Sequence, residues 1–167
     1  MNTFEPEHTG TLITSDYVSE KPQVEIIAGA KGVFAVEVFD QDMQGEPGSD
    51  RRILDVLSRF KVRFMSKDTN ANTITHYVDT TLKHVKRVVK ALEEEFPNAE
   101  ISTRKVALVS AIGSDMKVPG ILARSVKSLA DKDISVLAIH QCMRQVDIQF
   151  VIDEDKYDQA IVALHGA

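Results

Sequence analysis

An internal repeat is the feature of this sequence that most limits its fold. Residues 34–43 form an apolar run that ends in Asp42-Met43, and residues 107–116 form a similar run that ends in Asp115-Met116. A short loop follows each run and leads into a Pro-Gly pair, at residues 47–48 and at residues 119–120. Because self-similarity of this kind marks a duplicated supersecondary unit, we expect two copies of one fold.

Each copy continues with a helix, two strands and a second helix, as the spacing of its apolar residues indicates. In the first copy these elements are predicted at 49–59, 62–65, 74–79 and 82–92, and in the second at 121–131, 134–137, 148–153 and 157–164. Pro97 stops the second helix of the first copy. Each copy is therefore a β-α-β-β-α unit.

A fourth strand would complete each copy as a ferredoxin-like unit. The first copy has this strand at 99–103, whereas the second helix of the second copy runs to the end of the sequence. The spare strand-like segment is 24–27, and we expect it to pair into the second sheet because an open strand position would leave a sheet edge unpaired. The sequence thus predicts an α+β fold of two ferredoxin-like βαββαβ units, the first inserted within the second.

The repeat also predicts the domain boundaries. The expected segments are a polar linker at 1–23, a strand at 24–31 that completes the second unit, a first unit at 32–103 and a second unit at 104–167.

Composition removes several functional classes. The net charge is −5 and the pI is about 5.5, which argues against nucleic acid as the main partner because phosphate binding needs clustered cations. Cys142 is the single cysteine, so an intrachain disulfide or a CxxC metal site is excluded. Without a membrane-length apolar run or a secretory signal at residues 1–10, the sequence predicts a cytoplasmic protein.

Enzyme chemistry finds little support in the residue pattern. The five histidines are scattered, and neither HExxH, GxSxG nor a phosphate-binding glycine loop occurs. His76 and His140 fall in predicted strands, where a packed histidine is the usual case, and Cys142 fits a small buried residue better than a nucleophile. Five basic residues on one face of helix 82–92 fit a solvated surface.

The two repeated loops are the strongest candidates for a binding site. Each joins a strand to the start of a helix, where free backbone N–H groups attract a carboxylate. A glycine at that point lets a ligand approach the backbone. Asp42 or Asp115, at the end of the preceding strand, would hold an ammonium group, so the pattern suits a zwitterionic amino acid. The plainer alternative is that Pro-Gly forms only a turn.

Three stretches resemble the regulatory region of aspartate kinases, which carries tandem ACT domains. They are residues 2–13, residues 106–113 with Pro119-Gly120, and residues 150–155 with 163–165. The resemblance implies that residues 1–23 leave a kinase domain, that the parent enzyme uses ATP and Mg to phosphorylate L-aspartate to 4-phospho-L-aspartate, and that this chain lacks catalytic and metal-binding residues and cofactors. It also implies a homodimer through the ACT units and contact with the parent's kinase domain.

The resemblance places the amino-acid effector at the repeated loops. The effector residues expected in the first unit are Asp42, Met43, Pro47, Gly48, Ser49, Thr69, Asn70, Asn72 and Thr73. A second candidate site comprises Asp115, Met116, Pro119, Gly120, Ile121, Gln145 and Asp147.

Departures from the family pattern bear on the effector. Lysine-sensing relatives carry an acidic residue where this sequence has Met65, so the sequence favours threonine over lysine. The segment 142–147 also departs from the family pattern, and loosely resembles aspartate kinases that accompany ectoine synthesis. The alternatives are a free-standing ACT sensor that regulates another protein and, more remotely, a ferredoxin-like RNA-binding module, which would need paired aromatic residues in basic surroundings.

Overall fold

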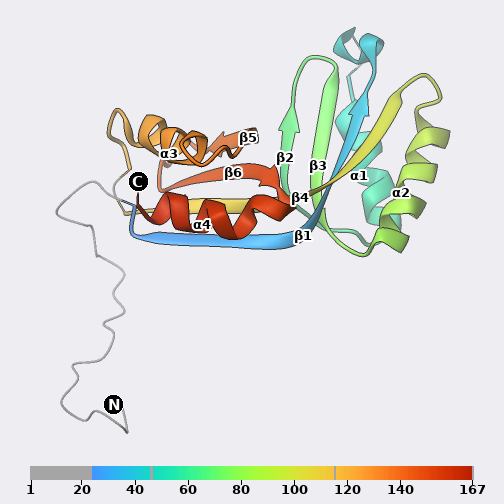
Figure 1. Cartoon of the computed structure of the whole chain (residues 1–167). Helices are drawn as coiled ribbons and strands as arrows, with labels where there is room; N and C mark the ends of the chain where they lie inside the picture. The colour runs from blue at the N-terminus through green and yellow to red at the C-terminus, as the bar shows by residue number, and fades with distance from the viewer. Residues whose placement is uncertain (1–23, 46, 115, 167) are drawn as a thin grey trace, which may run out of the picture.

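A computed structural model describes residues 24–45, 47–114 and 116–166 of the chain (Figure 1), so the predicted linker at 1–23 lies outside the described residues. The elements in chain order are β1 (Ile26–Phe39), η1 (Gln41–Gly45), α1 (Ser49–Arg59), β2 (Phe64–Thr69), β3 (Thr73–Asp79), α2 (Leu82–Glu95), β4 (Glu100–Ile112), α3 (Ile121–Ala130), β5 (Val136–Gln141), β6 (Asp147–Asp153), η2 (Glu154–Lys156) and α4 (Tyr157–His165).

The strands form one antiparallel sheet of six, in the order β2-β3-β1-β4-β6-β5. The first unit uses β2-β3-β1-β4 and the second uses β1-β4-β6-β5, so each unit has the strand order of a ferredoxin-like fold. The α+β, ferredoxin-like class predicted from the repeat is therefore confirmed. In Figure 1 the two units lie side by side with their strands running in different directions, and β1 and β4 pass from one to the other.

The two central strands are longer than the sequence suggested. Residues 24–27 and 34–39 were predicted as separate strands but belong to one segment, and β4 likewise joins the predicted strand 99–103 to the strand of the second copy. Ile26 pairs with Ile112 and Ile27 with Ala111, so the spare segment pairs into the second unit's sheet as expected. Because both strands cross between the units without a break, the exact domain boundaries stay a prediction.

A β-bulge separates the two halves of β1. Ala30 pairs with Leu108 and Val33 with Val106, so β1 holds one more residue than β4 at this point. Gly32 has a φ of 77°, in the left-handed region that favours glycine, and its N–H donates to Glu154 at 2.7 Å. The extra residue lets Val33 face the same side of the sheet as Ala30, and both pack in one buried cluster.

The predicted starts of β2 and β5 were two residues too early. Val62 and Ile134 were assigned to these strands, but each donates its N–H back to the preceding helix, to Leu57 O at 3.0 Å and to Leu129 O at 3.1 Å. The residues before them, Lys61 and Asp133, have positive φ angles of 55° and 53°. This is the Schellman arrangement, in which an apolar residue after the helix packs into the core instead of entering a strand.

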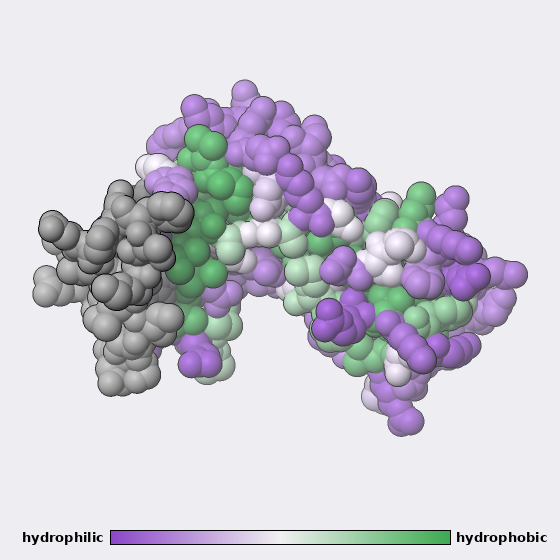
Figure 2. Space-filling model, turned by 90° about the horizontal axis from the view of Figure 1, so that it is seen from below, coloured by the Kyte–Doolittle hydropathy of each residue, from purple (hydrophilic) through white to green (hydrophobic). Residues whose placement is uncertain are grey.

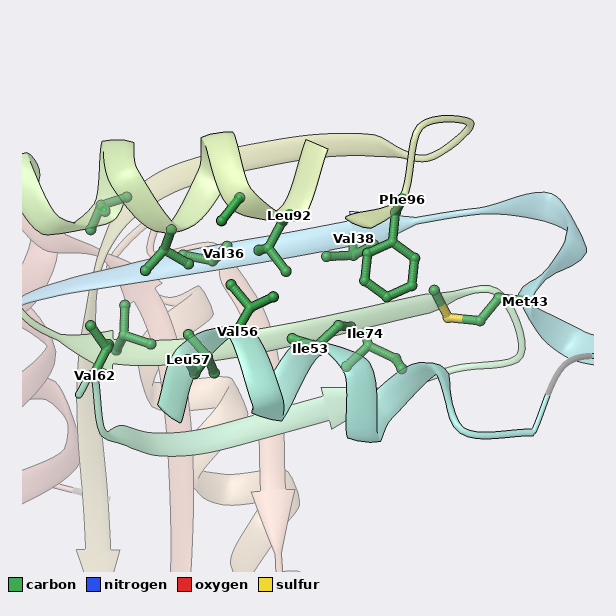
Figure 3. Close-up of a cluster of buried hydrophobic side chains, with 14 residues drawn as sticks. Val36, Val38, Met43, Ile53, Val56, Leu57, Val62, Ile74, Leu92 and Phe96 are labelled. Atoms are coloured by element: carbon green, nitrogen blue, oxygen red, sulfur yellow. The ribbon is translucent and has the colours of Figure 1, made fainter. Parts of the chain in front are cut away.

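The four α-helices of the described residues cover one face of the sheet. In the first unit, β1 residues Val36 and Val38 pack with α1 and α2 side chains such as Ile53 and Leu92 (Figure 3). In the second unit, β4 residues such as Val109 pack with α3 and α4. Thr81 caps α2 by accepting from His84 N at 3.4 Å.

The opposite face of the sheet is strongly concave. Its two outermost strands, β2 and β5, approach each other there, since His140 Nδ1 lies 3.3 Å from Asp68 Oδ1. Tyr77 donates its hydroxyl to the other oxygen of Asp68 at 2.5 Å, and its ring meets the His140 ring edge to face. The two units are thus joined both by the long strands and by this contact. Figure 2 shows them as two lobes with a narrower middle.

Gly29 is the point at which β1 passes closest to α4. A Cβ at this position would lie 2.7 Å from Leu108 O and 2.7 Å from the Tyr157 ring. We therefore expect Gly29→Ala to lower the free energy of unfolding by about 1–3 kcal/mol, because the Leu108 carbonyl belongs to the β1–β4 ladder and cannot move freely, and the half-buried Tyr157 ring would also have to shift.

Urea unfolding followed by circular dichroism measures this effect. Gly166→Ala is the matched control, since its nearest new contact is an ordinary 3.8 Å, and it should change stability by less than about 0.5 kcal/mol. Equal stability of the two variants would contradict the close packing of β1 on α4.

Candidate functional site

The loop before α3 forms a hollow of about 280 Å³ in the second unit. Its lining residues are Met116, Lys117, Val118, Pro119, Gly120, Leu122, Gln141 and Gln145. Four of the seven residues predicted for the second site, namely Met116, Pro119, Gly120 and Gln145, therefore lie together. Ile121 is buried beside them, Asp147 accepts from the Cys142 thiol at 3.3 Å, and Asp115 lies outside the described residues.

The start of α3 suits an anionic group. Gly120 precedes the helix with a φ of 98° and provides no side-chain cap for the N–H groups of the first turn, of which that of Ile121 lies 3.5 Å from Val118 O. Lys117 adds a full positive charge to the partial charge of the helix end. Lys117, Gln141, Val118 and Leu122 were missed by the sequence prediction, although Lys117 and Val118 stand within the repeated loop itself.

Glu25 holds this loop to the chain that leads into β1. Its two carboxylate oxygens accept from the Ser114 N–H at 3.0 Å and from the Ser114 hydroxyl at 2.9 Å. Ser114 directly precedes the loop, whereas Glu25 directly precedes β1. The loop is therefore tied to the segment that enters the described fold.

The residues predicted for the first site are divided among several environments. Asp42 lines a hollow of about 290 Å³ together with Asn98 and the acidic Asp40 and Glu100. Met43 is buried in the first unit's core (Figure 3), and Ser49 is buried as the first residue of α1. Pro47 is exposed, as is Gly48, which precedes α1 with a φ of 100°.

Three of the polar residues predicted for the first site lie on the face of the sheet away from α1. Thr69, Asn70 and Thr73 line a cavity of about 520 Å³ on the helix-free face of the sheet. Side chains of a strand alternate between faces, and on β3 it is Ile74 and Val78 that point toward the helices. Asn72 connects the two regions, since its carbonyl accepts from Asp40 N at 2.9 Å.

An ion pair and a buried histidine lie at the first turn of α1. Lys67 Nζ is 2.5 Å from Asp50 Oδ2, and His76 Nε2 is 3.7 Å from Asp50 Oδ1. Only 1% of His76 is exposed, and neither ring nitrogen has a hydrogen-bond partner among the residues that the structure describes. Burial lowers the pKa of His76 from 6.5 to about 4, against the opposing effect of Asp50, so the ring is neutral at pH 7.

Comparison with known proteins shows which proteins this chain is similar to. The ACT domain model matches residues 109–167. "Aspartate kinase Ask_Ect" of Stutzerimonas stutzeri is 54% identical over 166 residues, which cover 99% of this chain and 35% of the relative. Similarity to an aspartate kinase therefore extends over nearly the whole of this chain. A bifunctional aspartokinase/homoserine dehydrogenase of Haemophilus influenzae is 28% identical over 99% of this chain and 22% of its own length. The present chain thus spans about a third or less of the length of these two curated relatives.

Solved structures of aspartate kinases share the fold. The aspartokinase alpha and beta subunits superpose with a TM-score of 0.74 at 22% identity, over 86% of this chain and 97% of theirs. The regulatory subunit of aspartate kinase from Thermus flavus has the same TM-score at 16% identity, over 86% and 97%. The Clostridium acetobutylicum enzyme gives 0.76 at 19% identity, over 84% of this chain and 33% of its own.

No group of three or more histidine, cysteine, aspartate or glutamate side chains is arranged to hold a metal ion within 24–45, 47–114 and 116–166. In the same ranges, every helix is too short or too polar to span a bilayer.

The buried His76 makes stability depend on pH. Because the unfolded chain binds this proton near pH 6.5 and the folded chain only near pH 4, stability is complete above about pH 6.5 and declines as the pH falls toward 4. The contribution of this group reaches up to about 3 kcal/mol. His76→Leu should remove it, so the variant's stability should decline less over that range.

Urea unfolding at pH 7, 6, 5 and 4.5 measures the two slopes. His84→Gln is the matched control, because His84 is exposed on α2, and it should follow the wild-type slope. A His76→Leu slope equal to that of the wild type would show that another group causes the decline.

Proposed function

We propose that this chain senses a free amino acid and thereby regulates an aspartate kinase, the enzyme that transfers the γ-phosphoryl group of ATP to the side-chain carboxylate of L-aspartate. The observation that carries the proposal is the hollow at the start of α3, in which a glycine, the first N–H groups of the helix and Lys117 lie together. Homology over 99% of the chain supports this reading over a free-standing sensor.

The lining of the hollow suits a small zwitterion with a neutral side chain. The α-carboxylate would accept from the first N–H groups of α3 and lie near Lys117. Gln141 and Gln145 offer amide donors and acceptors to a hydroxyl group. The described lining residues contribute one cation and no carboxylate. If lysine were the ligand, its side-chain ammonium group would lie close to Lys117 without an anionic partner. This chemistry favours threonine.

The first unit offers a second candidate position. Asp42 lies in an acidic hollow with Asp40 and Glu100, which would attract an ammonium group but repel a carboxylate. The helix α1 also starts after a glycine without a side-chain cap. An amino acid bound in the first unit would have to place its ammonium group in the acidic hollow and its carboxylate at the start of α1, which are separate surfaces. The second unit is therefore the better candidate.

Regulation requires that the effector bind two states of the enzyme differently. The Glu25–Ser114 contact joins the loop of the proposed site to the chain entering β1. Binding that reorders the loop would thus act directly on that entering segment. A coupling of about 1–3 kcal/mol would be ordinary for such a system.

Isothermal titration of the chain with threonine tests the site. Lys117→Ala and Gln145→Ala should each weaken threonine binding about tenfold, since each removes a polar partner of the ligand. Lys132→Ala is the matched control for charge, because Lys132 is exposed outside the hollow, and it should leave the affinity unchanged. Lysine should bind more weakly than threonine.

The same titration distinguishes the two units. If Asp42→Ala or Asn72→Ala weakens binding while Lys117→Ala and Gln145→Ala do not, the effector binds at the first unit. If the wild-type chain binds no proteinogenic amino acid at millimolar concentration, the sensing function is wrong.

We also propose that two chains pair about a two-fold axis through their outer strands, β2 and β5. These strands are the edges of the sheet and leave Met65 and Ile139 exposed at 49% and 40%. Sedimentation equilibrium should give a dimer, and Ile139→Lys should shift it toward monomer because a charge in an apolar contact is costly. A wild-type monomer at all concentrations, with and without threonine, would contradict this.

A further inference from the structure

The helix-free face of the sheet contains a cavity of about 520 Å³. It lies between the two units, because strands of both units line it and the Asp68–His140 contact closes one side. Its volume falls within the range of small-molecule sites. The hollow at the start of α3 shares no lining residue with it, so the cavity is a separate place on the molecule.

The shape of the cavity follows from three rows of residues, each row consisting of a β1 residue and its paired neighbours on the adjacent strands. Thr75 and Ser102 flank Glu37, and in the next row Tyr77 and Arg104 flank Ala35. The small side chain of Ala35 leaves space between two long neighbours. The third row, at Val33 and Val106, is apolar and completely buried.

The polar end of the cavity carries an unneutralised negative charge. Glu37 accepts from the Thr75 and Ser102 hydroxyls at 3.3 and 3.4 Å. Within the described part of the chain, no lysine, arginine or histidine forms an ion pair with it. Arg104 is the one cation of the lining, and Asp153 engages it through two nitrogens at 2.9 and 2.7 Å.

The remaining polar groups of the lining do not compensate this charge. Asp68 adds a second carboxylate, which accepts from the Tyr77 hydroxyl. Burial and the neighbouring carboxylates raise the pKa of Tyr77, so its hydroxyl stays neutral and donates. The opposite wall is apolar and includes Ala138 and Val151, which are paired on β5 and β6. The cavity is therefore anionic at one end and hydrophobic at the other.

We propose that this cavity binds a small primary alkylammonium ion that lacks a carboxylate. The ammonium would donate to Glu37, with the Thr75 and Ser102 hydroxyls beside it, and the alkyl chain would lie against the apolar wall. A zwitterion is disfavoured because its carboxylate would meet Asp68 and Glu37 while Arg104 is held by Asp153. Since both units contribute to the wall, an occupant stabilises one relative position of the units.

The experiment is a titration of the 167-residue chain with n-butylammonium chloride, followed by ¹H–¹⁵N NMR at constant ionic strength. n-Butanol and sodium butyrate are the neutral and anionic probes of similar shape. We expect saturable shifts at β1, β3 and β4 residues of the cavity with butylammonium, and affinity at least about tenfold weaker for the other two probes.

Two variants test the assigned contacts. Glu37→Gln should weaken butylammonium binding about tenfold, whereas Glu93→Gln, which removes the same charge from an exposed position on α2, should leave it unchanged. Ala35→Leu keeps the charge but fills the space between Tyr77 and Arg104, and it should also reduce binding. Unchanged amide spectra elsewhere confirm that each variant is folded.

Several results would overturn the proposal. Butanol binding as tightly as butylammonium would show that charge plays no part, and shifts spread over acidic residues of the whole surface would show unspecific attraction. Shifts of the cavity residues on dilution of the protein alone would show that a second copy covers this face. Retained affinity in either Glu37→Gln or Ala35→Leu would exclude the assigned position.

Discussion

The pairing of β1 with β4 is the interaction on which the rest of the structure depends. Each of these strands serves both units, and the ladder runs from Ile26–Ile112 at one end to Phe39–Glu100 at the other. The bulge at Gly32 turns the ladder while keeping all helices on one face. As a result the other face becomes concave, the outer strands β2 and β5 meet across it, and the cavity between the units is formed.

Much of this fold could be predicted from the repeat alone, including both ferredoxin-like units and the pairing of residues 24–27. The errors were local. Val62 and Ile134 looked like the first residues of strands because they are β-branched and apolar, but the preceding left-handed residues turn them back onto their helices. A pattern of apolar residues cannot distinguish these two outcomes, since both bury the side chain.

The candidate site was predicted less completely. The repeated Pro-Gly loop did identify the start of α3, where Met116, Gly120 and Gln145 lie around one hollow. In the first unit, Thr69 and Thr73 follow α1 closely in the sequence, but they lie on the face of the sheet that is opposite to α1. Only the phase of each strand decides which face a residue takes, and the predicted strand ended at residue 65, so Thr69 was assigned to no strand. Glu37 carried no signal, because a single acid in an apolar strand usually faces solvent.

The order of the strands along the chain has a consequence for synthesis on the ribosome. Every strand and helix of the first unit comes from a continuous stretch that ends within β4, so this unit can close early. The first strand of the second unit to be made, residues 26–30, must wait for its partners at 108–112 and for β6 and α4 behind them. Until then the apolar edge near Ile26 and Ile27 is unpaired, and a nascent chain is most open to mispairing with a neighbour at this stage.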